Sequence, residues 1–257
     1  MHDRPGSAAG WLLWPLEYVG QVVGLAAEAA GYIIRGGISY RQTIDQMAHT
    51  GFSSLPLVIV TLGFTGMVMA FHAGEQAPKL SADAVVGWLV AEAMCRELGP
   101  VLVSIVVAAR VGSAIAAELG TMKVTEQIDA LRSMATSPIQ YLVVPRLIAC
   151  LVMVPSLAIV GDVAGVYGGW VFTWNSDYLT SRMYFASIWD NLELSTATAG
   201  IAKSVFFGLI IAVVGCHQGL YCRMDSEDVG RATYRSVVYA MLGIFVSDYF
   251  LTKMLFR

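Results

Sequence analysis

The sequence predicts an all-α polytopic membrane protein, and three observations lead to that fold class. Hydrophobic residues make up 56% of the 257 residues, and charged residues make up only 14%. A soluble domain averages about 45–50% apolar and about 25% charged residues, so these charges are too few to cover a water-facing surface. Several apolar stretches also reach the roughly 20 residues that a helix needs to cross a bilayer. Because lipid offers the backbone no hydrogen-bond partner, these stretches are expected to be helices.

The first element, Trp11–Ile34, is apolar but is expected to lie in the membrane interface. Polar positions recur along it at about helical spacing, at Glu17, Gln21, Gly24, Glu28 and Arg35. A polar stripe on an otherwise apolar helix is typical of a helix that lies at the membrane surface. A sixth membrane span is the alternative. The chain is predicted to form a single domain, 1–257, in which 1–50 hold this interfacial helix and a cytoplasmic lead-in and 51–257 form the transmembrane bundle.

Five transmembrane helices are predicted after the interfacial helix. They cover about Leu55–Ala73, Ala84–Ala109, Val143–Trp174, Thr198–Gly219 and Val237–Phe256. The first has no charged residue, whereas the third carries Asp162 and the fifth carries Asp248. An ionisable residue inside a membrane span is by default a candidate for function.

The Lys and Arg residues predict which ends of these helices face the cytoplasm. With five spans and a cytoplasmic N-terminus, ten lie inside: Arg4, Arg35, Arg41, Arg110, Lys123, Arg132, Arg146, Arg223, Arg231 and Arg235. Five lie outside: Lys79, Arg182, Lys203, Lys253 and Arg257. Because cytoplasmic loops are enriched in Lys and Arg, this excess favours a cytoplasmic N-terminus and a C-terminus on the opposite side.

Three charges, Glu92, Arg96 and Glu97, lie near the middle of the second span. Each would cost about 2.5–3.5 kcal/mol if it faced lipid, so they are expected to face protein, water or each other. Glu92 and Arg96 are four residues apart and can pair on one helix face. Glu97 points about 100° away from Arg96, toward another neighbour. The charges form either the lining of a path or a structural ion pair, and Pro100 is expected to bend the helix just after them.

Two rows of small residues predict close helix packing. The first row is Gly112, Ala116 and Gly120, and the second is Gly161, Gly165 and Gly169. Small residues at every fourth position let helix backbones approach each other in a membrane.

A short charged helix is predicted after the second span, on the cytoplasmic side. Its charged face carries Lys123, Glu126, Asp129 and Arg132, and its apolar stripe is Ile128, Leu131 and Met134. Such a helix can dock a soluble partner, or it can rest on the membrane surface.

Two connecting segments complete the prediction. The segment Asn175–Ser195 is expected outside, with aromatic residues that suit a membrane-interface belt. The segment His217–Tyr234 is expected inside, as a solvated turn.

Several activities are excluded or unsupported by the sequence. The net charge of −3 offers no basic surface to nucleic acid. The four cysteines form no CxxC pair and the four histidines have no metal-ligand spacing, so no metal site is expected. The chain has no GxxxxGK[ST] phosphate loop, no HExxH and no GxSxG, so ATP hydrolysis and hydrolase chemistry are not predicted for it.

Four blocks of sequence closely resemble the MlaE (YrbE) family of ABC-type permeases. They are Arg96-Glu97-Leu98-Gly99-Pro100, Ala109–Met122, Thr125–Leu131 and the later Val229–Thr233. The resemblance runs from about residue 40 to the end of the chain.

This resemblance implies a lipid transporter subunit in a bacterial inner membrane, moving phospholipid or a related lipid between the inner and outer membranes. Members of the family work as two permease copies with two cytoplasmic ATPase subunits, which hold ATP and Mg. A periplasmic MCE-domain protein completes the complex, in some systems together with a STAS-domain protein. The family fold also has an interfacial N-terminal helix followed by five spans. No cofactor is implied for the permease chain itself.

The resemblance also implies two sets of site residues. The lipid cavity lies between the two copies and is lined partly by the first two spans, so Met67, Met69, Arg96 and Glu97 are expected to contact lipid. The coupling helix falls on about Val124–Ala135, so the ATPase is expected to contact Glu126, Ile128, Asp129, Leu131 and Arg132. The sequence departs from the family around Gly74–Leu80, where Glu75, Pro78 and Lys79 make the outer mouth of the cavity more polar.

Two alternatives to this function follow from the residues alone. An ion-coupled secondary carrier could use the intramembrane charges as a relay, through Glu92, Arg96, Glu97, Asp162 and Asp248. Such carriers usually contain internal repeats, and no convincing repeat is found here. A membrane scaffold that only anchors partners would not need charges in the centre of a span.

Overall fold

The computed structural model describes residues 8–76, 85–175 and 179–255. Every regular element within these ranges is a helix. Five helical stretches are long and apolar enough to span a membrane: Tyr40–Glu75, Val86–Val124, Ile139–Phe172, Leu194–Leu220 and Ser226–Leu255. The predicted all-α polytopic fold is therefore confirmed. Arg4, Pro78, Lys79 and Arg257, which entered the predictions above, lie outside the described residues.

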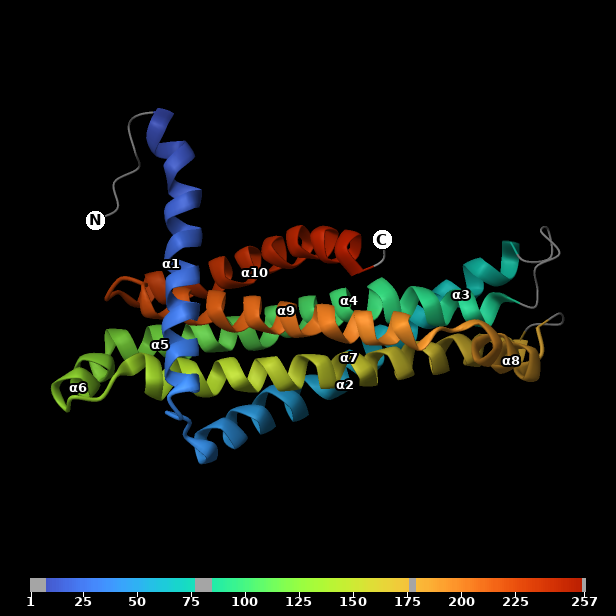
Figure 1. Ribbon diagram of the computed structural model, residues 1–257, viewed down its shortest axis with the longest axis horizontal. Coiled ribbons are helices and arrows are strands. Elements are labelled where there is room, and N and C mark those ends of the chain that lie inside the picture. The colour runs from blue at the N-terminus through green and yellow to red at the C-terminus, as the bar shows by residue number, and fades with distance from the viewer. Residues whose placement is uncertain (1–7, 77–84, 176–178, 256–257) are drawn as a thin grey trace.

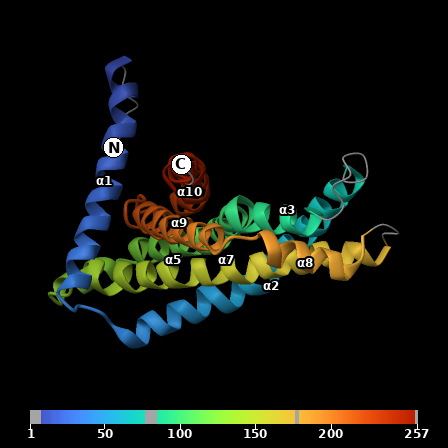
Figure 2. The ribbon, with the colours of Figure 1, turned by 45° about the vertical axis from the view of Figure 1, so that its right-hand side comes forward.

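Helix α1, Ala8–Ile34, runs across the long helices rather than along them (Figures 1 and 2). It lies near the end of the bundle that also holds α6 (Gln127–Ser133). A helix in this orientation cannot pass through the same membrane alongside the five spans. The arrangement therefore fits the predicted interfacial helix and not the alternative of a sixth span.

Helix α2, Tyr40–Gln76, is the first span and begins well before the predicted Leu55, so residues 40–50 are already its first turns. It packs along α7, Val144–Phe172, through glycines of both helices. A Cβ atom at Gly66 would overlap the backbone of Gly165, and one at Gly168 would overlap the backbone of Gly63. The small-residue row predicted in the third span is therefore a packing face within the chain.

The second span is one long helical stretch interrupted by two π-helical turns. Its segments are α3 (Val86–Ala93), η3 (Met94–Leu98), α4 (Gly99–Val107), η4 (Ala108–Gly112) and α5 (Ser113–Val124). Such π turns are frequent at functional sites, and η3 contains Arg96 and Glu97. The predicted packing row in this span is also confirmed, because Gly112 and Gly120 face side chains of the last two spans and the turn between them.

The remaining elements follow the predicted order. They are η5 (Ile139–Val143), η6 (Thr173–Asn175), α8 (Ser181–Asn191), α9 (Leu194–Leu220) and α10 (Ser226–Leu255). The segment predicted as an outer aromatic loop thus contains helix α8. Its Tyr184 is fully buried and its hydroxyl donates to the carbonyl of Val166 at 3.0 Å, whereas Trp189 remains exposed.

The predicted solvated turn is confirmed only in part: residues 223–227 are exposed, but the turn is shorter than His217–Tyr234. Helix α9 continues to Leu220 and α10 begins at Ser226, so the turn itself is short. His217 is only 4% exposed and Asp228 only 8%. His217 lies against Gln21 of α1, whereas Asp228 accepts from the backbone N–H of Arg223 and lies 3.9 Å from Arg235.

Helices α2 and α10 lie on opposite sides of the bundle, with α7 and α9 between them (Figures 1 and 2). Only 28% of the apolar window of α2 and 11% of that of α10 is buried, against 50–61% for the other three spans. These two helices therefore present apolar side chains to lipid or to another protein chain.

Candidate functional site

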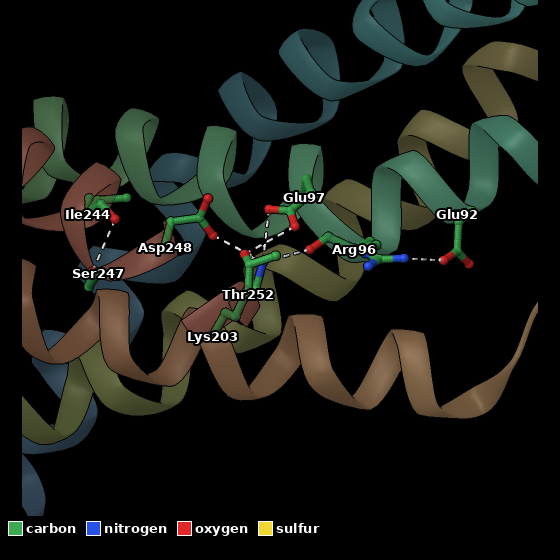
Figure 3. Close-up of polar contacts among 8 residues, drawn as sticks. All are labelled: Glu92, Arg96, Glu97, Lys203, Ile244, Ser247, Asp248 and Thr252. Atoms are coloured by element: carbon green, nitrogen blue, oxygen red, sulfur yellow. Dashed lines mark hydrogen bonds and ion pairs between the residues drawn. The ribbon is translucent and has the colours of Figure 1, made fainter. Parts of the chain in front are cut away.

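Lys203 on α9 is the centre of a polar cluster inside the bundle (Figure 3). Its side chain is fully buried. Nζ donates to Oε2 of Glu97 at 2.8 Å and to Oδ1 of Asp248 at 3.1 Å. Oγ1 of Thr252 lies 2.6 Å from the same nitrogen and donates to Oε1 of Glu97 at 3.2 Å. We call Glu97, Lys203, Asp248 and Thr252 the Lys203 cluster; it joins η3, α9 and α10.

Pro100 explains why Lys203 also reaches the backbone. Proline has no N–H, so the carbonyl of Arg96, four residues earlier, lacks its usual helical donor. Lys203 Nζ supplies that hydrogen bond at 3.2 Å. The backbone around this point takes the π-helical form, in which the N–H of Gly99 donates to the carbonyl of Met94. The predicted bend is thus combined with a side-chain donor from another helix.

The charges of the Lys203 cluster do not cancel when both carboxylates are ionised. One ammonium then faces two carboxylates, which leaves one net negative charge in the membrane. The carboxylates are also the open part of the cluster, because 36% of the Glu97 side chain and 20% of the Asp248 side chain is exposed. The cluster therefore combines a sealed cation with acidic groups that a cation, a proton or a polar ligand can reach.

Arg96 lies on the other side of the same turn and forms the predicted pair with Glu92. The Nη1 atom of Arg96 is 3.3 Å from Oε1 of Glu92, to which Thr196 also donates at 3.5 Å. The Arg96 side chain is 39% exposed and points away from Lys203 (Figure 3). A half-open guanidinium can bind a phosphate or carboxylate with paired hydrogen bonds.

The two methionines predicted to line the lipid cavity face different sides of α2. Met67 borders a small cavity of about 200 Å³ between α2 and Gly168 of α7, whereas Met69 packs against the core of the bundle. Residues two apart on a helix point about 200° apart, so one helix face cannot hold both. The two side chains therefore lie on different faces of α2, and their contact with lipid stays a prediction. The Lys203 cluster is also formed without any side chain of α2.

The predicted coupling segment is helix α6, entered at Glu126 with a φ of 60° and left at Ala135 with a φ of 56°. Its apolar stripe is divided, because Ile128 is only 3% exposed and Leu131 is partly buried, whereas Met134 is 66% exposed. Ile128 therefore does not lie on the exposed face that the sequence suggested. The surface that remains open is formed by Glu126, Asp129, Arg132 and Met134.

Polar contacts connect the base of α6 to the spans. Lys123, at the end of α5, donates to the carbonyl of Leu220 at the end of α9 at 2.6 Å. Arg146 on α7 is buried and pairs with Glu118 of α5 at 2.9 Å. A push on α6 would therefore be passed to α5, α7 and α9 together.

Lys203 and Thr252 are the functional candidates that the sequence-based reasoning missed. Lys203 was placed outside with the loop lysines, although it falls within the predicted fourth span. A lysine flanked by apolar residues on both sides carries the same intramembrane signal as Glu97. Asp162, by contrast, was singled out but joins neither network, and its Oδ1 atom has no hydrogen-bond partner among the described residues.

The sequence matches the family described as Permease MlaE over residues 43–254. The chain belongs to the MlaE permease family. A probable ABC transporter permease protein from Rickettsia typhi is 40% identical over 229 residues, covering 89% of this chain and 88% of that protein. One from Synechocystis is 38% identical over 257 residues, covering 100% and 97%. Protein TRIGALACTOSYLDIACYLGLYCEROL 1, chloroplastic, from Arabidopsis thaliana is 35% identical over 242 residues, covering 91% and 67%.

The match covers the five spans, both charged networks and helix α6. Membership of the MlaE family gives this multi-pass membrane protein a role in transport, since its bacterial relatives carry the name of ABC transporter permeases. An ABC transporter permease implies an ATPase partner, and this sequence contains no GxxxxGK[ST] motif.

Proposed function

We propose that this MlaE-family permease moves phospholipid, or a related lipid, between the inner and outer membranes of a bacterium. The observation that carries this proposal is the partly exposed side chain of Arg96, which lies next to the Lys203 cluster in an apolar helix bundle. Arg96 can pair with a lipid phosphate, while apolar helix faces accept the acyl chains. The plant relative, whose name is that of a galactosylated diacylglycerol lipid, supports a lipid substrate.

The working unit in this proposal is a dimer of two identical permeases. Helix α10 has a broad exposed apolar face that includes Leu242, Phe245, Val246 and Phe250. Asp248 and Thr252 of the Lys203 cluster are on the same helix. A second copy packed near α10 would shield the exposed side of Glu97 from lipid and enclose a shared cavity beside Arg96.

The power source in this proposal is a separate ATPase that hydrolyses ATP with Mg and docks on α6. Most described Lys and Arg residues of the loops lie at the α6 end, which supports a cytoplasmic position for that end. The N-terminus is then cytoplasmic and the C-terminus periplasmic. An MCE-domain protein would sit at the α8 end, and a STAS-domain protein, where present, would bind the ATPase.

Photocrosslinking tests the proposed lipid path. A photoreactive amino acid is placed at Arg96, at Met67 or at Val163, an exposed position on α7 that serves as the lipid-facing control. Crosslinking is compared in the ATPase complex with and without ATP. ATP-dependent labelling of phospholipid at Arg96, with unchanged labelling at Val163, is the expected result. Labelling confined to Val163 would remove the basis of the proposal.

A pull-down tests the docking of the ATPase on α6. Met134 is 66% exposed and Met224, in the turn between α9 and α10, is 60% exposed, so they form a matched pair. Met134→Asp should release the ATPase and Met224→Asp should retain it. Leu131→Asp should also release it, because it detaches α6 from the bundle, whereas Arg132→Glu should weaken binding less, as a rim charge does. Release by Met224→Asp alone would place docking on the other turn.

The ion-coupled carrier remains the competing proposal, since two carboxylates share one lysine in the Lys203 cluster. Its relay would need to continue through Glu92 and Asp162, and neither hydrogen-bonds to the cluster in the described structure. Lipid transfer in proteoliposomes distinguishes the two. Transfer that needs ATP and the ATPase supports the permease, and transfer driven by a proton gradient without ATP supports the carrier.

A further inference from the structure

A second polar site lies far from the charged centre of the second span. A cavity of about 650 Å³ is enclosed by α1, the end of α9 and the start of α10. Its lining includes Tyr18, Gln21, His217, Gln218, Arg223 and Arg235. Lys203 and His217 are 14 residues apart on α9, which corresponds to about 21 Å along the helix. We call this space the interfacial cavity, and it is separate from the proposed lipid path.

The wall between α1 and α9 is held by a network of aromatic and amide side chains. Nε2 of Gln218 donates to the hydroxyl of Tyr18 at 3.1 Å, and Nε2 of His217 lies 3.2 Å from Oε1 of Gln21. The His217 ring stacks on Tyr221 with 4.6 Å between centroids. These contacts fix α1 against α9, so this wall is preformed.

The opposite wall carries the cations of the interfacial cavity. Arg231 pairs with Glu227, and Arg235 is 3.9 Å from Asp228. The side chain of Arg223 makes no hydrogen bond or ion pair with any residue that the structure describes. Its backbone N–H donates to Asp228 at 2.8 Å, which anchors the turn while leaving the guanidinium uncommitted.

The charge of the lining favours an anion. Three arginines, Arg223, Arg231 and Arg235, face the cavity together with two acids, Glu17 and Asp228. Arg231 is paired with Glu227 and Arg235 contacts Asp228 only at 3.9 Å, so the charge of Arg223 is the one left for an anion. The long Arg235–Asp228 contact also leaves Arg235 able to share its guanidinium with a ligand.

The depth of the cavity identifies the ligand. Helix α1 runs across the spans as an interfacial helix does, so a cavity bordered by α1 would be at the level of the lipid headgroups. Basic pockets between helices at this level bind anionic headgroups, and tyrosines are enriched there because they are apolar with a polar tip. We propose that the interfacial cavity binds the phosphate of an anionic phospholipid headgroup, from the leaflet in which α1 lies, and that this lipid holds α1 against α9 and α10.

Native mass spectrometry of the full-length permease tests this proposal. Wild-type protein is mixed with phosphatidylglycerol or with phosphatidylcholine, and the retained lipids are counted. The test variant is Arg223→Ala with Arg235→Ala, and Arg41→Ala, an exposed arginine at the start of α2, is the control. The preference of the wild type for phosphatidylglycerol should fall about tenfold in the double variant and stay unchanged in Arg41→Ala. Equal melting temperatures of the three proteins without lipid would show that the fold is kept.

Two further measurements distinguish a lipid headgroup from free phosphate, and the interfacial cavity from the transport path. Inorganic phosphate should not raise the melting temperature as phosphatidylglycerol does, and equal stabilisation by both would overturn the assignment to a lipid. Arg96→Ala should keep the preference, because Arg96 belongs to the proposed transport path. A wild type without preference, or a preference lost in Arg96→Ala and kept in the double variant, would also overturn the proposal. The transport proposal is unaffected by either result.

Discussion

Arg96 and Glu97 are neighbours in the sequence but belong to two networks with different access to the surroundings. Glu97 binds Lys203, whose side chain is fully buried and has several acceptors. Arg96 pairs with Glu92, and more than a third of its side chain is exposed. A step of about 100° along the helix separates a network centred on a fully buried lysine from one centred on a partly exposed arginine.

This difference suggests what each network does. A buried lysine is tolerated in a membrane only when its charge is paired and its donors are used, and Lys203 meets both conditions by joining three helices. Its main effect is therefore to hold η3, α9 and α10 together. Arg96 has a weaker pair and an exposed guanidinium, so its effect falls on a ligand. Substitutions in the two networks should separate stability from transport.

Replacing Lys203 should have the largest effect on the stability of the protein. Lys203→Met leaves Glu97 and Asp248 facing each other without a cation, and breaking such a buried pair costs about 3–5 kcal/mol. We expect a strong loss of folded protein in the membrane and a lower melting temperature in detergent, measured by a thermal unfolding assay.

The control for this prediction neutralises the whole cluster. Lys203→Met combined with Glu97→Gln and Asp248→Asn removes all three charges, so much of the stability should return. Glu97→Gln alone should keep the fold, because one lysine then faces one aspartate, while altering transport. A Lys203→Met protein as stable as the wild type would show that the cluster is not structural.

Replacing Arg96 should lower the stability of the protein less than replacing Lys203, and it should reduce lipid transport more. Arg96→Ala leaves Glu92 without its cation, but both side chains are partly exposed, so the cost should be about 1–2 kcal/mol. Lipid transfer between donor and acceptor vesicles by the ATPase complex should be nearly lost. Arg96→Lys, which keeps the charge without the paired donors, should restore part of it. If Arg96→Ala transfers lipid at the normal rate, Arg96 contributes to stability and not to lipid transport.

The fold could be predicted almost completely from the sequence because membrane spans are read from local composition. The pair of Glu92 and Arg96 was also predictable, since it depends only on spacing within one helix. The partners of Glu97 were not, because Lys203 and Asp248 come from two other helices and their pairing depends on how α9 and α10 rotate. Packing against the bundle likewise reversed the expected exposure of Ile128, which amphipathic spacing alone cannot reveal.

The interfacial cavity shows the same limit of local reasoning. His217 and Asp228 are flanked by glycine, arginine and aspartate in a segment that resembles a solvated turn. His217 is buried because α1, about 200 positions earlier in the chain, supplies Gln21 beside it and Tyr18 beside Gln218. A polar sequence predicts exposure only where no distant element returns to cover it.

Two threonines provide the smallest and most closely matched test of the comparison. Thr252 donates to Glu97 at 3.2 Å and lies 2.6 Å from Lys203, whereas Thr196 makes only a 3.5 Å contact with Glu92. Valine has nearly the shape of threonine without the hydroxyl. Thr252→Val should cost about 1 kcal/mol or slightly more, since its two partners are charged and poorly solvated. Thr196→Val should change the unfolding free energy by less than about 0.5 kcal/mol, because a contact of that length contributes little. Denaturant titration of the two variants in the same detergent measures both values. If Thr196→Val proves the more destabilising, then the Glu92–Arg96 side, and not the Lys203 cluster, holds the helices together.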